Sequence, residues 1–242
     1  MVGDVATAPS VVRGAITAGR VAEVLCADGL AVTGWLALGN AVPSDGLAPG
    51  VQALALIGPD GPAMWAAFTA APEFADGRAH PMDRWSWRVI GDAAALLEAD
   101  AVFPTDGPPY PPFLSWAMRA EAAAPSPLGM VATPARGLMA SWRGALAFRA
   151  VPDAMPAAVM GSERPVCAAC AQPCATACPA GAFQSAGYDA DACRAFLDTP
   201  EGAVCTAAGC LARRACPASL SLSAAQQAFH LAAFRKGGGG AG

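Results

Sequence analysis

Residues 167–183 read CAACAQPCATACPAGAF, which places four cysteines close together and a proline directly after the last of them. Dense disulfide pairing is typical of small exported domains, whereas closely spaced thiols in an intracellular chain more often bind metal. The N-terminal stretch MVGDVATAPSVVRG lacks the basic start and apolar core of a signal peptide, and 242 residues can bury a core without covalent cross-links. The sequence therefore predicts a cytoplasmic protein whose thiols bind metal.

The spacing of these thiols favours iron over zinc. The run is Cys167-x2-Cys170-x3-Cys174-x3-Cys178-Pro179, whereas structural zinc sites usually combine two separated Cys-x2-Cys pairs. Bacterial ferredoxins use C-x2-C-x2-C-x3-C-P, so this run differs only by an additional residue in its middle gap. In ferredoxins with two clusters the cysteine before the proline ligates the other cluster, so a second run is expected.

A second run of cysteines does follow. Cys193 precedes Cys205-x4-Cys210-x5-Cys216-Pro217, and here too the last cysteine stands before a proline. Exchange of the two Cys-Pro ligands between the runs predicts two 4Fe–4S clusters. The predicted ligands are Cys167, Cys170, Cys174 and Cys216 for the first cluster, and Cys178, Cys193, Cys205 and Cys210 for the second. The alternative is one cluster together with a zinc site or a redox-active remainder.

Composition limits the other possibilities. Hydrophobic residues make up 55% of the chain and charged residues 14%, which indicates a globular protein with a large core. No apolar stretch reaches the roughly 18 residues of a membrane span. A formal net charge of −4 without clustered Lys or Arg makes a nucleic-acid partner unexpected. The ninth cysteine, Cys26, lies in the apolar stretch VAEVLCADG and is expected to be a small buried hydrophobe.

The part of the chain before the cysteines alternates between predicted helices and strands. Helices are expected at 10–28, 63–71, 82–98 and 112–123, and strands at 30–39, 51–58, 100–104, 128–134 and 144–151. This alternation predicts an α/β sandwich whose apolar strands are covered on both faces. Short helices and a last helix at 222–236 are expected in the cysteine-rich part. The predicted division is an α/β domain at 1–160, a ferredoxin-type domain at 161–236 and a disordered tail at 237–242.

Two parts of the sequence carry a resemblance to a known family. The motifs CAACAQPCATACPAGAF, DACRAFL and GCLARRACP follow one another in the order used by epoxyqueuosine reductases, which are cobalamin-dependent iron–sulfur enzymes of tRNA modification. The stretch PPFLSWAMRAEAAAPSPLGMVATPARGLMASWRGALAF, at 111–148, is similar to the region before the clusters in that family. It is also similar to the cobalamin-processing domain of the methylmalonic aciduria type C protein.

This resemblance implies a nitroreductase-like α/β fold and two 4Fe–4S clusters. It also implies a corrinoid pocket edged by 130–134 and 137–146, with Met130, Pro134, Gly137 and Trp142 as the candidate cofactor contacts. The family delivers a proton from an acidic residue ahead of a Tyr-His pair. The corresponding stretch here, GRAHPMDRW, offers only His80 and Asp83 as candidates. Epoxyqueuosine reduction itself is not expected, because the helical repeats that grip tRNA are missing.

Two functions follow from these features. In the first, two clusters pass electrons to a corrinoid, a similar cofactor or a substrate in the α/β domain, which makes the protein an oxidoreductase. In the alternative, the chain is a ferredoxin-like electron carrier or accessory protein without its own catalysis. The expected partner is a redox protein or a small molecule. Arg136 and Arg143 are candidates for holding an acid group of a bound cofactor, and His230 is expected to pack against the clusters.

Overall fold

An antiparallel four-stranded sheet forms the centre of the N-terminal part in the computed structural model, which describes residues 15–38, 46–157, 166–185 and 187–236. The strands lie in the order β1 (Leu30–Ala37), β2 (Ala53–Pro59), β6 (Gly144–Phe148) and β3 (Asp100–Val102). The late strand β6 inserts between β2 and β3 and pairs with both. The central sheet therefore forms only when segments from both ends of the α/β part come together.

The two central strands are apolar on both faces. In β2, Ala55 and Ile57 belong to one hydrophobic core, whereas Leu54 and Leu56 belong to the other. This alternation follows from the period of two in a strand, which turns successive side chains to opposite faces. A sheet that is buried on both sides needs helices over both faces, and the structure provides them.

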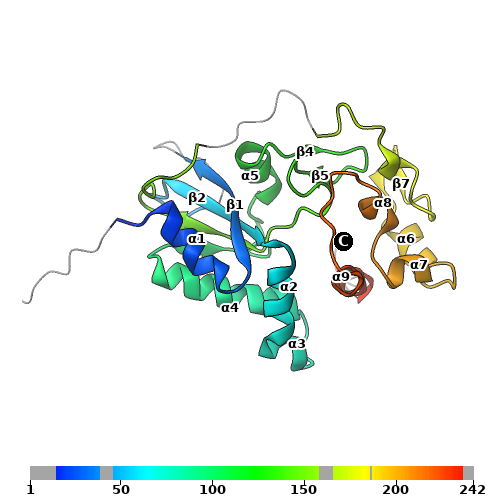
Figure 1. Cartoon of the computed structure of the whole chain (residues 1–242), viewed down its shortest axis with the longest axis horizontal. Coiled ribbons are helices and arrows are strands. Elements are labelled where there is room, and N and C mark those ends of the chain that lie inside the picture. The colour runs from blue at the N-terminus through cyan, green and yellow to red at the C-terminus, as the bar shows by residue number, and fades with distance from the viewer. Residues whose placement is uncertain (1–14, 39–45, 158–165, 186, 237–242) are drawn as a thin grey trace, which may run out of the picture.

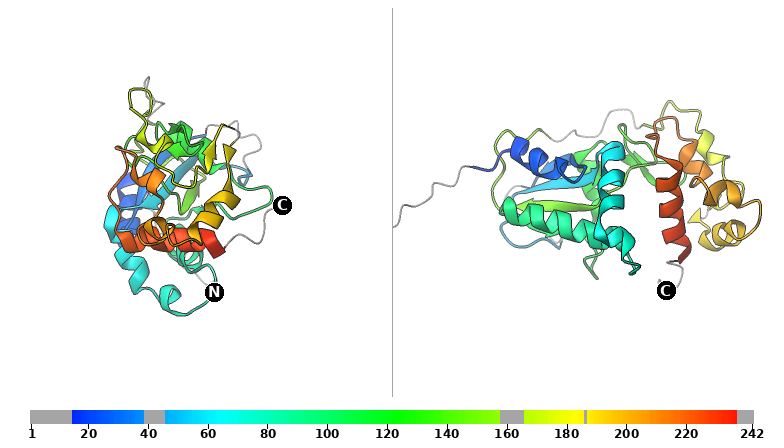
Figure 2. Two further views of the ribbon diagram at one scale, coloured as in Figure 1. Left: turned by 90° about the vertical axis from the view of Figure 1, so that its right-hand side faces the viewer. Right: turned by 60° about the horizontal axis from the view of Figure 1, so that its bottom comes forward.

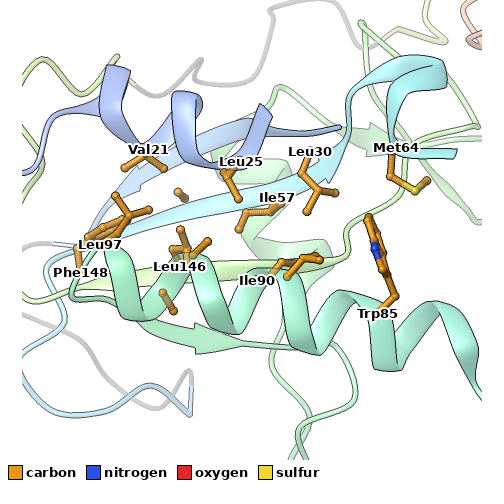
Figure 3. Packing of buried hydrophobic residues seen from close by; sticks show 14 of the residues in the cluster. Val21, Leu25, Leu30, Ile57, Met64, Trp85, Ile90, Leu97, Leu146 and Phe148 are labelled. Atoms are coloured by element: carbon orange, nitrogen blue, oxygen red, sulfur yellow. The ribbon is translucent and has the colours of Figure 1, made fainter. Parts of the chain in front are cut away.

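The first face of the sheet is covered by several helices. They are α1 (Ala18–Cys26), α2 (Gly61–Ala70) and α4 (Pro81–Leu96), and the short helix α3 (Pro72–Ala75) packs against α2 and α4 rather than on the sheet. Figure 3 shows Val21 and Leu25 of α1 and Ile90 of α4 directed toward Leu146 of β6. The other face is covered by α5 (Phe113–Ala120), whose Trp116 is fully buried. The prediction of a mixed helix-and-sheet fold with a sheet covered on both faces is confirmed.

The cysteine-rich part consists of short elements beside this body (Figure 1). They are the 3-10 helix η1 (Pro173–Ala175), strands β7 (Phe183–Gln184) and β8 (Gly187–Tyr188), and helices α6 (Ala190–Leu197), α7 (Ala203–Thr206), α8 (Leu211–Arg214) and α9 (Ala224–Lys236). The right-hand view of Figure 2 shows α9 between the short helices and the α/β body. Phe229 of α9 packs against Trp65, Phe68 and Phe74, with ring centroids 5.3 to 6.1 Å apart. These aromatic contacts tie the C-terminal part to α2 and α3.

Some expected elements differ in extent. The strand expected at 128–134 shrinks to β5 (Val131–Ala132), which pairs only with β4 (Ala124–Pro125). Gly129 has a positive φ before β5, and Thr133 turns back to bond Gly137 after it, so tight turns limit the strand. The expected domain boundary near 160, the tail at 237–242 and the start of the helix expected at 10–28 fall outside the described residues.

Two further expectations concern burial and membranes. Cys26 is exposed at the end of α1, so the prediction of a buried Cys26 is wrong. The helix face that enters the core carries Val21 and Leu25, and the residue after Leu25 is rotated away from that face. Among the helices in the described ranges, none combines the length and the apolar character that crossing a membrane requires.

Candidate metal centres and the adjoining cavity

Four cysteines from both runs meet at one hollow of about 320 Å³. They are Cys167, Cys170, Cys174 and Cys216, here called the first thiol group. Burial raises the pKa of the Cys174 thiol, and its neighbour Cys216 raises it further. Burial also raises the pKa of the Cys167 thiol, and its neighbours raise it further; these are Cys174, Cys216 and Cys170, in order of decreasing effect. The structure thus brings together the four residues that the spacing assigns to one cluster.

The other four cysteines line a second, larger cavity of about 450 Å³, here called the large cavity. Cys178, Cys193, Cys205 and Cys210 form the second thiol group. Burial raises the pKa of the Cys205 thiol, and Cys210, Cys178 and Cys193 raise it further in that order. These are the residues that the sequence assigns to the other cluster. Cys193 comes from α6 and Cys205 from α7, while Cys210 directly precedes α8.

Close backbone packing holds the second run of cysteines against the rest of the chain. Gly137 has a φ of 52°, and a Cβ there would lie 2.5 Å from the backbone nitrogen of Ser219. Gly209 has a φ of 85°, and a Cβ there would lie 2.5 Å from Cβ of Gln227 in α9. Both positions therefore need glycine for conformation and for space. They hold the segments on either side of α8, which carry Cys210 and Cys216.

The chemistry of the two thiol groups suits cations. All nine cysteines are free of disulfides. A set of thiols that raise one another's pKa ionises at a cost, and bound metal cations remove that cost because they stabilise thiolates. Within the described ranges no three His, Cys, Asp or Glu side chains converge on a single ion. A 4Fe–4S cluster binds one thiolate at each iron, so its ligands surround a larger volume than those of one ion.

The candidate corrinoid contacts lie in different environments. Met130 lines the large cavity, whereas Pro134 is exposed. The space beside Gly137 is occupied by the backbone of Ala218 and Ser219. The indole N–H of Trp142 donates a hydrogen bond of 2.6 Å to Glu121 rather than facing the cavity. Of the four, Met130 alone lines the large cavity.

The candidate proton donors lie outside the large cavity. His80 is the residue before α4, and its side chain is 76% exposed. Its Nδ1 lies 4.0 Å from Oδ2 of Asp83, whose side chain is 44% exposed. Neither residue lines the cavity. In the described part of the chain, no Asp or Glu side chain lines it either.

Glu121, which directly follows α5, is a structural residue that sequence reasoning missed. Its buried carboxylate accepts hydrogen bonds from Thr33 Oγ1 at 2.5 Å and from Trp142 Nε1 at 2.6 Å, and it forms an ion pair with Arg136. Thr33 sits at a bulge in β1, which aims its hydroxyl toward α5. The only sequence signal was a lone acid at the end of an apolar helix.

The Glu121 network connects the sheet to the cysteine-rich part. Arg136 lines the large cavity, and its carbonyl oxygen accepts a hydrogen bond from the backbone N–H of Leu220 at 3.4 Å. Ser219 supports the same junction, because its hydroxyl accepts a hydrogen bond from the backbone N–H of Leu138 at 3.1 Å. Glu121 thus holds Arg136, and with it a wall of the large cavity, in place.

The fold and the site together define a mixed helix-and-sheet protein that gathers eight thiols of its C-terminal part into two groups of four. Compared with protein-family models, with curated proteins and with solved structures, the chain has no match. Its function is therefore inferred from its own residues.

Proposed function

We propose that this chain is an iron–sulfur redox protein that holds two 4Fe–4S clusters and passes electrons to a small molecule bound in the large cavity. The observation that carries the proposal is the grouping of the thiols. Spacing and the Cys-Pro rule divide eight cysteines into two sets of four, and the same two sets line the two hollows. A cytoplasmic location, where thiols stay reduced, belongs to the proposal.

The packing around the thiols supports electron transfer between the two centres. Cys174 of the first thiol group is buried in a hydrophobic cluster with Leu138 and Ala212, and residues of both thiol groups pack against that cluster. Both centres therefore share one apolar body. Low solvent exposure and a fixed environment are the means by which a protein sets the potential of a cluster. Because the second thiol group lines the large cavity, a molecule bound there would lie beside the second cluster.

The first test is the metal content of protein produced and purified without oxygen. We expect a brown protein with about eight irons and matching acid-labile sulfide per chain, as two four-iron clusters require. Its broad visible absorbance should bleach on addition of dithionite. Protein that takes up zinc and no iron under these conditions would contradict the proposal, and about four irons would favour one cluster with a different second centre.

The electron-carrier alternative is favoured by one observation, which is that no carboxyl side chain in the described part of the chain lines the large cavity. A reductase that protonates its substrate commonly places an acid there. The lining of the cavity favours the first function, because besides the second thiol group it includes Met139, Ser141 and Arg143 of the α/β part, which a carrier does not need in order to hold its cluster. A carrier would bind no small molecule in it.

The corrinoid and the nitroreductase-like fold remain predictions from the resemblance. The antiparallel sheet with helices on both faces supports the nitroreductase-like fold. A cavity of about 450 Å³ has the size of sites for small molecules, and a complete cobalamin is larger than such ligands. Titration of cob(II)alamin into the iron-loaded protein tests the corrinoid. If it binds, the absorbance and electron-spin spectrum of the cobalt change, and unchanged spectra at tens of micromolar would exclude it.

A further inference from the structure

The large cavity is bounded by both parts of the chain. Leu128, Met130 and Met139 line it from the segment between α5 and β6, and Phe196 and Leu231 line it from α6 and α9. Its volume of about 450 Å³ includes the space beside the second thiol group where the proposed cluster would sit, and the rest of its lining is mostly apolar with a few polar groups, as in sites for small molecules. The identity of those polar groups therefore indicates what the cavity binds.

Two arginines supply the charge in this cavity. Arg143, which directly precedes β6, donates a hydrogen bond of 2.7 Å to Ser141 Oγ, and its buried Nε has no hydrogen-bond partner in the described residues. Arg213 of α8 donates from Nε to the carbonyl oxygen of Leu138 at 2.9 Å. Burial lowers the pKa of both guanidinium groups. Each guanidinium thus donates one of these hydrogen bonds within the protein, and its other N–H groups can donate to a ligand.

His230 of α9 lies close to both arginines. Burial, and to a smaller extent the charges of Arg143 and Arg213, lower the pKa of its imidazole to about 4. Near neutral pH the imidazole is therefore uncharged and can donate a single hydrogen bond. The positive charge of the cavity thus comes from the arginines.

No carboxylate compensates these charges inside the cavity. Arg136 also lines it, but its charge is paired with that of Glu121. In the described part of the chain, neither Arg143 nor Arg213 forms an ion pair, and Asp83, the acid that acts on Arg143, lies outside the cavity and 44% exposed. Buried charges without partners are costly, so such an arrangement is typical of a site whose partner is a bound anion.

The second thiol group can neutralise only part of the positive charge of Arg143 and Arg213. Cys210 is the group that acts favourably on Arg213, so a cluster at that position would partly neutralise it. The charges that act on Arg143 are those of Asp83 and Arg213, and no thiol is among them. Of the two arginines, Arg143 is therefore the one less affected by the second thiol group.

We propose that the large cavity binds a small organic anion, with an acid group held by Arg143 and Arg213 and an apolar body against the leucine, methionine and phenylalanine side chains of its walls. The inference rests on the proposed function and adds the class of molecule that would lie beside the second cluster. A carboxylate and a phosphate ester both fit this description, since a guanidinium binds either group through paired N–H donors.

The test uses iron-loaded protein and four probes, namely phenylacetate, octanoate, phenyl phosphate and the uncharged phenylacetamide. Calorimetry and ligand-detected NMR should show binding of at least one acid, little binding of the amide, and competition between the acids that bind. Carboxylate and phosphate sources are distinguished by which probe binds more tightly. The electron-spin signal of the dithionite-reduced protein should change when the acid is added, because the site adjoins a cluster.

The matched variants are Arg143→Gln and Arg149→Gln. Arg149 is an exposed arginine that pairs with Asp100 at the sheet edge, and it does not line the cavity. Arg143→Gln should weaken acid binding roughly tenfold or more, as loss of a charged hydrogen bond does, while Arg149→Gln leaves it unchanged. Arg143→Lys should restore part of the affinity, which also guards against a simple folding defect.

Several outcomes would overturn the inference. One is the failure of every acid to bind; another is equal binding of phenylacetate and phenylacetamide. A third is a changed cluster potential in Arg143→Gln with unchanged acid affinity, which would assign Arg143 to the cluster instead. Iron analysis of the same samples separates the two proposals. If the protein holds eight irons and binds no acid, only the anion site is contradicted. If the protein takes up no iron under the loading conditions and still binds the acid, only the clusters are contradicted.

Discussion

Replacement of Cys216 by alanine is expected to remove one complete cluster, about four of the eight irons per chain, and to leave the other intact. The cluster that is lost should be the one held by Cys167, Cys170 and Cys174, although these belong to the other run. The physical reason is the position of Cys216 at the hollow of the first thiol group. Loss of one of four thiolates exposes an iron and destabilises the cluster.

Pairs of substitutions distinguish this exchange from clusters formed within each run. If the ligands are exchanged, Cys174→Ala with Cys216→Ala removes about four irons, because both residues belong to one cluster. Cys174→Ala with Cys178→Ala then removes all eight. Clusters formed within each run would reverse these two results. Iron and sulfide analysis of the purified variants measures the difference.

The matched control for these variants is Cys26→Ala. Cys26 is an exposed cysteine at the end of α1 and lies outside both hollows. The control should therefore keep all eight irons and the visible spectrum of the unaltered protein. Loss of iron in this control would mean that Cys26 is a ligand, and the assignment of the eight others would be wrong.

Glu121→Ala is expected to lower the free energy of unfolding by about 3–5 kcal/mol, which is the usual effect of removing one member of a buried ion pair. Arg136 would be left as a buried charge without its partner, and Thr33 and Trp142 would each lose a short hydrogen bond. Chemical unfolding without oxygen, followed by tryptophan fluorescence, measures the change. Glu23→Ala is the control, because Glu23 pairs with Arg20 at the surface and contributes at most about 1 kcal/mol.

A second substitution separates the buried charge from the lost contacts. Glu121→Ala combined with Arg136→Met removes both charges, so it should be less destabilising than Glu121→Ala alone. An effect of Glu121→Ala no larger than that of Glu23→Ala would show that the network does not hold the cavity wall. In the iron-loaded protein we also expect Glu121→Ala to weaken acid binding, since Arg136 lies in that wall.

Much of the architecture could be predicted from local patterns. The strands β1, β3 and β6 lie within the expected ranges, and β2 ends one residue beyond its expected range, because short apolar runs between turn residues define these strands. Helix α4 was recognisable by its periodicity, and it begins at Pro81, which suits the first turn of a helix. The pairing order β1-β2-β6-β3 was not predictable, because it depends on contacts between segments far apart in sequence.

The sequence by itself determined which residue types and spacings are available for the proposed metal centres, because ligand spacing in one loop is a local property. The tertiary structure places Cys216 beside the first run, as the Cys-Pro rule predicts from the sequence, and it alone decided that Glu121 anchors Arg136 and that Arg143 and Arg213 line one cavity. Arg143 stands beside a β-strand and Arg213 in a short helix seventy residues later in the chain. Contacts between such distant residues depend on the packing of α8 and α9 against the α/β body, and no local sequence pattern encodes that packing.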